Sequence, residues 1–160
     1  MTSREIKTER LTMRPHTPQD FAACAAMWAD PAVVRHISGK PSTREESWSR
    51  LLRYAGHWAA MNFGFWAVHE TASGSFIGDV GLSEFRREIV PSIEGTAEAG
   101  WVLVSQAHGK GYATEAVRAA LGWYENAYGY GRTVCMIAPY NFASLRVAEK
   151  CGYREFAKAH

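Results

Sequence analysis

Apolar residues recur along the chain with two different periods, and the changes between these periods predict its elements. Residues 10–14 alternate apolar and polar side chains, which is typical of a half-buried strand. Thr17, Pro18 and Asp20 then supply a capping hydroxyl, a proline at the first helical position and an acid that reaches back. We expect the helix that starts here to extend to about Trp28.

A second helix is expected after Thr43. Residues 43–46 form a capping box, and Asp30-Pro31 separates this helix from the first one. Five apolar residues follow at helical spacing: Trp48, Leu51, Leu52, Ala55 and Trp58. We expect them to face the core or to line a groove.

The middle of the chain is predicted to form an antiparallel meander. Residues 65–70 and 75–82 have the pattern of strands, and the small and polar residues 71–74 between them suit a hairpin turn. Residues 96–104 have the pattern of a third strand, which is partly buried on both faces toward its end.

A crossover is predicted to follow the meander. From Tyr112 onward, apolar residues recur at every third and fourth position, so we expect an amphipathic helix that Gly129 can end. Residues 133–138 are predicted to form a strand. Asn141 can then cap a short helix that ends at Gly152.

Together these elements describe an α+β protein. Helices pack on a mostly antiparallel central sheet, with a late β-α-β crossover, and residues 153–156 are expected to add one more strand. The chain has 160 residues, of which 47% are hydrophobic, so it can bury one substantial core. No linker or repeat divides it, and we expect a single domain over residues 1–160.

Charge and composition argue against several classes of function. The formal net charge is +2 and no basic run is present, so we expect no nucleic-acid partner and no membrane association. Residues 1–10 are polar where a secretory signal would be apolar, which predicts a cytoplasmic protein. The three cysteines are expected to be reduced core thiols, and the histidines lack metal-ligand spacing, so no metal is expected.

A turn with two glycines, residues 106–111 (QAHGKG), joins the third meander strand to the crossover helix. Gly109 and Gly111 can adopt backbone angles that other residues avoid, and the N–H groups of about residues 108–113 could line an anion nest aided by the helix dipole. Lys110 adds positive charge. A plain strand-to-helix turn is the alternative, so the glycines alone indicate a phosphate site without establishing it.

Two other phosphate-binding motifs do not fit this turn. A Walker loop needs four residues between its glycines and Lys-Ser/Thr after them, and a dinucleotide fingerprint needs Gly or Ala where Thr114 stands. The hairpins before Val104 also argue against the parallel sheet of a nucleotide-binding oxidoreductase.

A second constellation lies further along the chain, on the next predicted helix. Asn141 and Ser144 open this helix, and residues 149–153 (EKCGY) end it. Together with the glycine turn, this order of motifs resembles the GNAT superfamily of acyl-CoA-dependent N-acyltransferases and is similar to its Rim-type branch. In that branch, residues 98–103 resemble the central strand and residues 109–116 resemble the pyrophosphate turn with its helix.

The resemblance implies acetyl-CoA as co-substrate and a way of holding it. The strands before and after the crossover helix would run parallel and splay apart, so that unpaired backbone groups of the central strand hold the pantetheine arm like an added strand. The implied CoA-binding residues are Trp101, Val102, Leu103, Val104, Gln106, His108, Gly109, Lys110, Gly111, Tyr112, Ala113, Asn141, Ser144 and Lys150. For His108 we expect packing or a nucleotide contact rather than the role of a base.

The implied reaction is direct attack of a primary amine on the thioester in a ternary complex. A carboxylate should remove the proton of the amine. Glu98 is the candidate base, because acids are unusual in the buried middle of a strand, and a solvent-facing charge is its alternative. Asp79 and Glu84 are further candidates. The tyrosine with which many members protonate the thiolate corresponds to Ala148, so Ser144 is expected to orient or protonate the thiolate.

The acceptor stays open at this level. A small-molecule amine and the α-amine of a protein N-terminus both fit, and residues 33–43 and 85–94 are expected to shape the pocket. A non-catalytic acyl-CoA-binding module is the alternative function. The resemblance also predicts a strand beyond residues 153–156, which the second subunit of a homodimer could supply.

Overall fold

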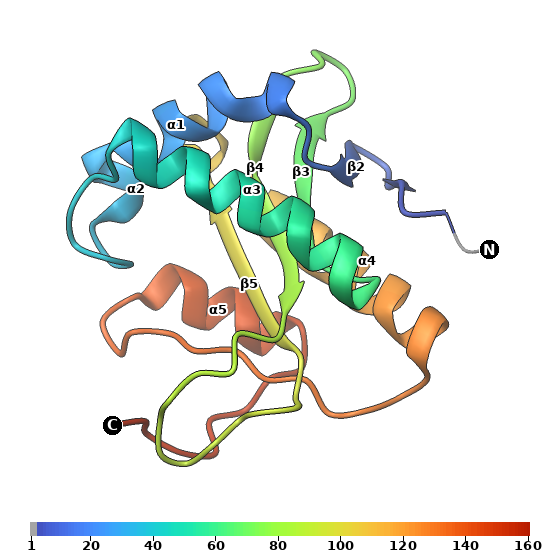
Figure 1. Ribbon diagram of the computed structural model, residues 1–160, viewed down its shortest axis with the longest axis vertical. Coiled ribbons are helices and arrows are strands. Elements are labelled where there is room, and N and C mark those ends of the chain that lie inside the picture. Colours follow the sequence, from blue (N-terminus) through green and yellow to red (C-terminus); the bar gives the residue numbers. More distant parts are fainter. Residues whose placement is uncertain (1–2) are drawn as a thin grey trace.

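The computed structural model describes residues 3–160, in which helices cover both faces of one five-stranded antiparallel sheet (Figure 1). The strands lie side by side in chain order: β1 (Ile6–Lys7), β2 (Leu11–Pro15), β3 (Phe65–Glu70), β4 (Phe76–Ser83) and β5 (Glu98–Leu103). The α+β class and the antiparallel meander are confirmed. The strand β1 was not predicted, because two residues are too few to show an alternating pattern.

The helices divide between the two faces of the sheet. In Figure 1, α3 (Arg44–Met61) crosses in front of the sheet, near α1 (Phe21–Ala29) and α2 (Pro31–Val34), and α4 (Tyr112–Tyr128) lies behind it. The helix α5 (Phe142–Lys150) contacts α4, and two short 3-10 turns, η1 (Pro18–Asp20) and η2 (Ser105–Ala107), precede α1 and follow β5. Over residues 3–160, none of these helices combines the length and the apolar character that a membrane span requires.

The predicted helix starts form as expected. The carboxylate of Asp20 accepts the Thr17 N–H at 2.8 Å before α1. Before α3, the Thr43 N–H donates to the Glu46 carboxylate at 2.8 Å, and the Glu46 N–H donates back to the Thr43 hydroxyl at 3.1 Å. These bonds satisfy N–H groups that the first turn of a helix cannot pair internally.

The buried face of α3 differs from the predicted one. Its inward side chains are Ser47, Leu51, Tyr54 and Trp58. The prediction was wrong for Trp48 and Leu52, which are 38% and 49% exposed, and for Ala55. Consecutive helical positions are about 100° apart, and because Leu51 lies on the buried face of α3, its neighbour Leu52 is turned toward solvent.

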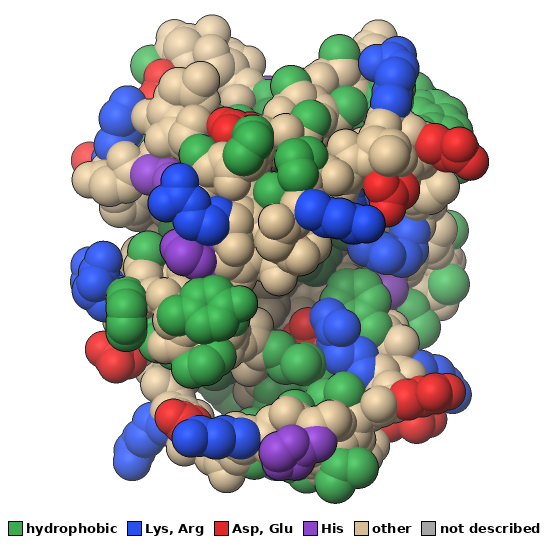
Figure 2. Space-filling view, turned by 90° about the vertical axis from the view of Figure 1, so that its left-hand side faces the viewer, with side chains coloured by type: hydrophobic (Ala, Val, Ile, Leu, Met, Phe, Trp, Pro, Cys, Tyr) green, Lys and Arg blue, Asp and Glu red, His purple; other side chains and the backbone are tan. Residues whose placement is uncertain are grey.

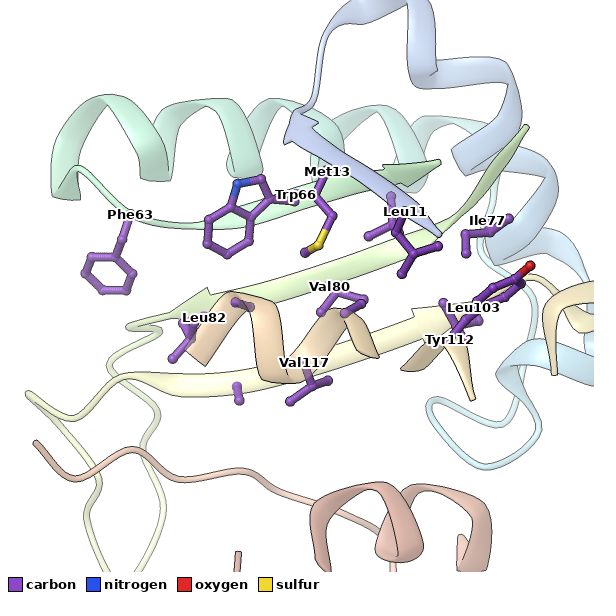
Figure 3. Close-up of a cluster of buried hydrophobic side chains, with 14 of the residues drawn as sticks. Leu11, Met13, Phe63, Trp66, Ile77, Val80, Leu82, Leu103, Tyr112 and Val117 are labelled. Carbon is purple, nitrogen blue, oxygen red and sulfur yellow. The ribbon is translucent and has the colours of Figure 1, made fainter. Parts of the chain in front are cut away.

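The main core lies between the sheet and α4 (Figure 3). Leu11 of β2, Trp66 of β3 and Val80 of β4 are almost completely buried in it, together with Val117 of α4. Three successive positions on one face of α4 are buried, Ala116, Val117 and Ala120, which confirms the predicted amphipathic helix. This packing fixes α4, and with it the glycine turn, against β4 and β5.

The end of the crossover is less regular than predicted. Residues 133–138 form no extended strand, and Val134 makes a single parallel bridge with Glu98. In the described chain, residues 153–156 are not a strand either, so this second prediction was wrong. Strand propensity needs a neighbouring strand to pair with, and β5 pairs with this segment only at its first residues. The rest of that edge of β5 is left open.

The three cysteines carry free thiols, as predicted, but only Cys24 is buried, and Cys135 and Cys151 are half-buried. Burial raises the pKa of Cys135 to about 11, so this thiol is protonated at neutral pH.

Asp20 fastens the start of α1 to the sheet. Its two oxygens each accept a hydrogen bond from Arg14 of β2 at 2.8 Å, and His69 of β3 lies 3.7 Å away. Burial by itself would raise the pKa of Asp20, but the nearby His69 and the hydrogen bonds from Arg14 and the Thr17 N–H hold that pKa well below its usual range.

We expect Asp20→Asn to destabilise the fold at neutral pH and to reduce its sensitivity to acid. In an unfolded chain, the pKa of an aspartate is about 3.9. Because the folded pKa is lower, the carboxylate stabilises the fold above that pH and loses this contribution as the pH falls toward the folded value. Urea unfolding from pH 7 to pH 2 measures the effect, with the exposed Glu88→Gln as control. Equal acid slopes in the wild type and Asp20→Asn would contradict it.

Candidate functional site

The outer edge of β5 presents backbone groups to an opening. The Ala99 N–H donates away from β4, to the segment that carries Val134, at 2.8 Å. Because successive residues of a strand alternate in direction, Trp101 and Leu103 also point their N–H and C=O groups away from β4. Val102 pairs with β4 instead, and so does Val104, whose N–H donates to a β4 carbonyl at 2.9 Å. Of the four predicted backbone residues, 101–104, only Trp101 and Leu103 therefore direct their N–H and C=O groups away from β4.

Side chains hold this edge in place from both faces of the sheet. Val102 and Val104 pack against a cluster contributed by α1 and α2, which consists of Met27, Trp28, Val33 and Val34. Leu103 is buried in the main core, and Trp101 packs against it. The open edge is thus a rigid element.

His108 covers one group of the edge. Its Nε2–H donates to the Leu103 carbonyl at 2.9 Å, so Trp101 and the Leu103 N–H remain directed toward the opening. This backbone contact was not among the roles predicted for His108. Gln106, on η2, is exposed.

The glycine turn has the backbone conformation that its sequence predicts. Gly109 and Gly111 have φ angles of 76° and 79°, in the left-handed region that favours glycine. The Glu115 N–H donates to the Gly111 carbonyl at 3.1 Å as the first bond of α4, so the N–H groups of residues 112–114 have no acceptor within the helix. The His108 N–H is already bonded within η2, so the nest begins at Gly109 rather than at residue 108.

A cluster of side chains around Arg10 stabilises this turn. The guanidinium of Arg10 donates to the Lys110 carbonyl at 2.9 Å and to the Glu115 carboxylate at 2.7 Å. It also lies 4.3 Å from the ring centre of Tyr112, whose hydroxyl donates to Glu70. In a trans peptide the C=O and the next N–H point in opposite directions. Arg10 therefore directs the N–H that follows Lys110 away from itself, toward the nest.

An open hollow with basic walls lies beside the turn. Arg118 of α4 donates to the Lys150 carbonyl at 2.9 Å, which ties α4 to the end of α5. The residues that border the hollow are Glu9, Arg10, Gly111, Thr114, Glu115, Arg118 and Lys150. The exposed Lys110 adds a further positive charge to the turn itself.

The first turn of α5 faces the early helices. Asn141 caps α5 by accepting the Ser144 N–H at 3.2 Å, and this bond uses its side-chain oxygen but not its amide NH₂. The preceding Tyr140 contacts His36, which follows α2, with ring centres 5.5 Å apart. Figure 2 shows this side of the molecule, where a hollow crosses the surface.

Glu98 is buried at the start of β5, with 7% of its surface exposed. The alternative of a solvent-facing charge is therefore wrong. Arg87, from the loop after β4, donates from Nε and Nη2 to the two carboxylate oxygens at 2.6 and 2.9 Å. The hydrogen bond with Glu98 raises the pKa of Arg87. The pair keeps a negative charge in place on a buried strand.

Asp79 belongs to a buried polar cluster that the sequence did not predict. It is fully buried, with His16 Nε2 at 2.6 Å and the Trp28 indole N–H at 3.0 Å. Cys24 completes the cluster. Its Sγ, a ring nitrogen of His16 and a carboxylate oxygen of Asp79 all lie within 4.8 Å of one another. Burial and the neighbouring Asp79 raise the pKa of the Cys24 thiol. Glu84, the other alternative base, is half-buried and accepts the backbone N–H of Arg86 at 2.6 Å.

These features form one continuous surface. An open strand edge leads through η2 into a nest of N–H groups with a positive helix end, and a basic hollow adjoins the nest. Such a surface suits an extended chain that carries phosphate groups at one end.

The family model described as an acetyltransferase (GNAT) domain matches residues 10–154. The chain belongs to the GNAT family of acetyltransferases. A Bacillus subtilis protein, YkkB, is 32% identical over 155 residues, which cover 92% of this chain and 84% of the relative. A structure described as a GnaT-family acetyltransferase from Bordetella pertussis is 31% identical, with a TM-score of 0.84 over 97% of this chain and 91% of that one.

The structural neighbours of this GNAT domain include Rim-type enzymes. The structure of RimL, a ribosomal L7/L12 α-N-protein acetyltransferase in complex with coenzyme A, has a TM-score of 0.75 at 15% identity, over 92% of this chain and 82% of that one. At this identity the likeness shows the fold alone. Relatives named as N-acetyltransferases support that activity class for the chain.

Two parts of this GNAT domain had no local signal in the sequence. Arg10 and Glu115 are 105 positions apart, and Arg87 and Glu98 are 11 positions apart across a loop. Only the sheet and its packing bring these charges together. The one feature of the sequence that could have indicated the pair of Arg87 and Glu98 was a basic residue in the loop before a strand that begins with an acid.

Proposed function

We propose that the protein transfers the acetyl group of acetyl-CoA to a primary amine by direct attack in a ternary complex. The observation that carries this proposal is the continuity between the open edge of β5 and the N–H nest at the start of α4. The pantetheine arm of CoA is an extended amide chain, and its pyrophosphate follows at the end that would meet the nest.

Each part of CoA has a matching group in the site. The backbone groups of Trp101 and Leu103 would bond the pantetheine amides, and the NH₂ of Asn141 would donate to a pantetheine carbonyl. The pyrophosphate would accept hydrogen bonds from the backbone N–H groups from Gly109 onward. Arg118 and Lys150, in the basic hollow, would neutralise the phosphate on the ribose.

The transfer step needs little more than orientation and proton handling. The neutral amine attacks the thioester carbonyl, the carbon–sulfur bond breaks, and the amine proton leaves as the amide forms. We assign its removal to Glu98 acting through water, and the donation of a hydrogen bond or proton to the departing thiolate to Ser144. Arg87 would hold the Glu98 carboxylate in a fixed orientation.

The test is thiol release from acetyl-CoA across a panel of amines and peptides, with CoA affinity measured by calorimetry. Ser144→Ala should leave the CoA dissociation constant within about twofold and slow transfer by roughly 10-fold or more. Tight CoA binding without transfer to any amine would favour the non-catalytic acyl-CoA-binding module. Absence of CoA binding would overturn the proposal.

A further inference from the structure

Two arginines on one edge of α3, Arg50 and Arg53, border a shared hollow. The other residues that line it are Thr43, Glu45, Glu46 and Ser49. Among the described residues, neither arginine has a carboxylate within ion-pair distance. Glu46, the acid nearest in sequence to Arg50, bonds the Thr43 N–H in the capping box.

Arg50 is the less usual of the two. Its guanidinium stacks 3.6 Å above the Trp28 ring, and its Nη2 donates to Ser42 at 3.2 Å. Its Nη1 is buried and has no hydrogen-bond acceptor among residues 3–160. The charge of Arg50 is therefore not offset by a carboxylate of residues 3–160, and the stack on Trp28 holds the guanidinium in place. Burial, the largest influence, lowers the pKa of Arg50.

Arg53 extends the positive edge toward Glu98. Its guanidinium lies 5.5 Å from the ring centre of Phe85, and that of Arg87 lies 4.8 Å from the same ring. Arg87 in turn binds both oxygens of Glu98. Three arginines, Arg50, Arg53 and Arg87, therefore lead from the hollow on α3, which Glu45 and Glu46 also line, to the carboxylate that would accept the amine proton.

We propose that the acceptor amine carries a carboxylate, which Arg50 and Arg53 bind while the amine lies near Glu98. This inference rests on the proposed acetyltransferase function and names its substrate class. Acceptors of this class are an acidic amino acid and a peptide with acidic residues near its N-terminus, in which a short chain separates the amine from the carboxylate. The same arginines disfavour polyamines and aminoglycosides, because they would repel the additional positive charges of these acceptors.

The experiment compares acceptors that differ only in the carboxylate. Free glutamate is compared with glutamine α-amide, which has no carboxylate, and a C-terminally amidated hexapeptide with glutamate at positions 2 and 3 is compared with its glutamine counterpart. We expect kcat/KM to be at least 10-fold higher for the carboxylate member of one pair or both. Preference within the amino-acid pair alone indicates a small-molecule acceptor, and preference within the peptide pair alone indicates a protein N-terminus.

Charge reversal tests the assigned residues. Arg53→Glu should reduce the carboxylate preference to unity or below and leave the CoA dissociation constant unchanged. The control is Arg154→Glu, at an exposed position for which the structure gives no ion pair within residues 3–160; it should keep the wild-type preference. Arg50→Gln should also reduce the preference, and its melting temperature shows whether it folds.

Three outcomes would overturn this assignment. They are equal rates within both pairs, faster transfer to spermidine than to any carboxylate acceptor, and an Arg53→Glu variant with the wild-type preference. Failure of the proposed function itself looks different, because CoA then does not bind or no amine of any charge is acetylated.

Discussion

Gly111→Glu is expected to raise the CoA dissociation constant by roughly 100-fold or more, because it places a carboxylate where the nest would receive the pyrophosphate. Gly111 has a φ of 79°, so any side chain also strains the start of α4, by about 1–2 kcal/mol. The added carbon would lie 3.5 Å from the guanidinium of Arg10, so the new carboxylate could also compete for the group that orients the turn. Calorimetric titration with CoA measures the loss.

Gly122→Glu is the matched control for this variant. Gly122 lies on the same helix at an exposed position, and an added side chain there meets nothing within 4 Å. It should bind CoA as the wild type does. Comparison with Gly111→Ala separates backbone strain from charge. Normal CoA binding by Gly111→Glu would show that the phosphate is held elsewhere.

Glu98→Gln is expected to lower kcat by roughly 100-fold or more while the CoA dissociation constant stays the same, because the amide cannot accept the amine proton. Steady-state thiol release and CoA calorimetry measure the two quantities. Arg87→Gln should have a different effect. It leaves the carboxylate buried without its cation, so the melting temperature and kcat should fall together.

The control for the Glu98 variant is Glu94→Gln. Glu94 makes an exposed ion pair with Arg86 at 3.4 Å, so the substitution repeats the chemical change outside the buried strand. Exposed pairs contribute little, and near-wild-type activity is expected. If Glu98→Gln lowers the melting temperature but keeps most of kcat, Glu98 is a structural partner of Arg87, and the base is another group.

The turn and the acceptor side are controlled by different arginines. Arg10 binds the Lys110 carbonyl and orients the N–H groups that would meet the pyrophosphate, whereas Arg50 and Arg53 line the hollow on the other face of the sheet. Substitutions in the two groups should therefore separate cofactor affinity from acceptor choice, since their effects on distant sites are expected to add.

Local features of the fold could be predicted from the sequence because their causes lie within a few residues. The capping boxes at Thr17 and Thr43 join a residue to one three positions away, and both form. The left-handed angles of Gly109 and Gly111 follow from the absence of a side chain. The resemblance to the GNAT superfamily, which rests on the glycine turn and on the motif from Asn141 to Tyr153, is confirmed.

Other features depended on contacts between distant segments. The strand predicted at residues 133–138 shrank to the Val134 bridge, because pairing depends on a neighbour that local pattern does not specify. For the same reason, the sequence could name Glu98 as an acidic residue on a strand but not Arg87 as its partner. It also gave no sign that Arg50 has a buried, unsatisfied nitrogen.

By itself, the sequence determined the family, the order of the main elements and the backbone conformation of the glycine turn, because short-range hydrogen bonds and glycine angles need no distant partner. The tertiary structure decided which backbone groups of β5 stay open, how Arg10 orients the turn, and where the unpaired arginines lie. Ion pairs and strand edges are set by which surfaces the packed core brings together, and that information is spread over the whole chain.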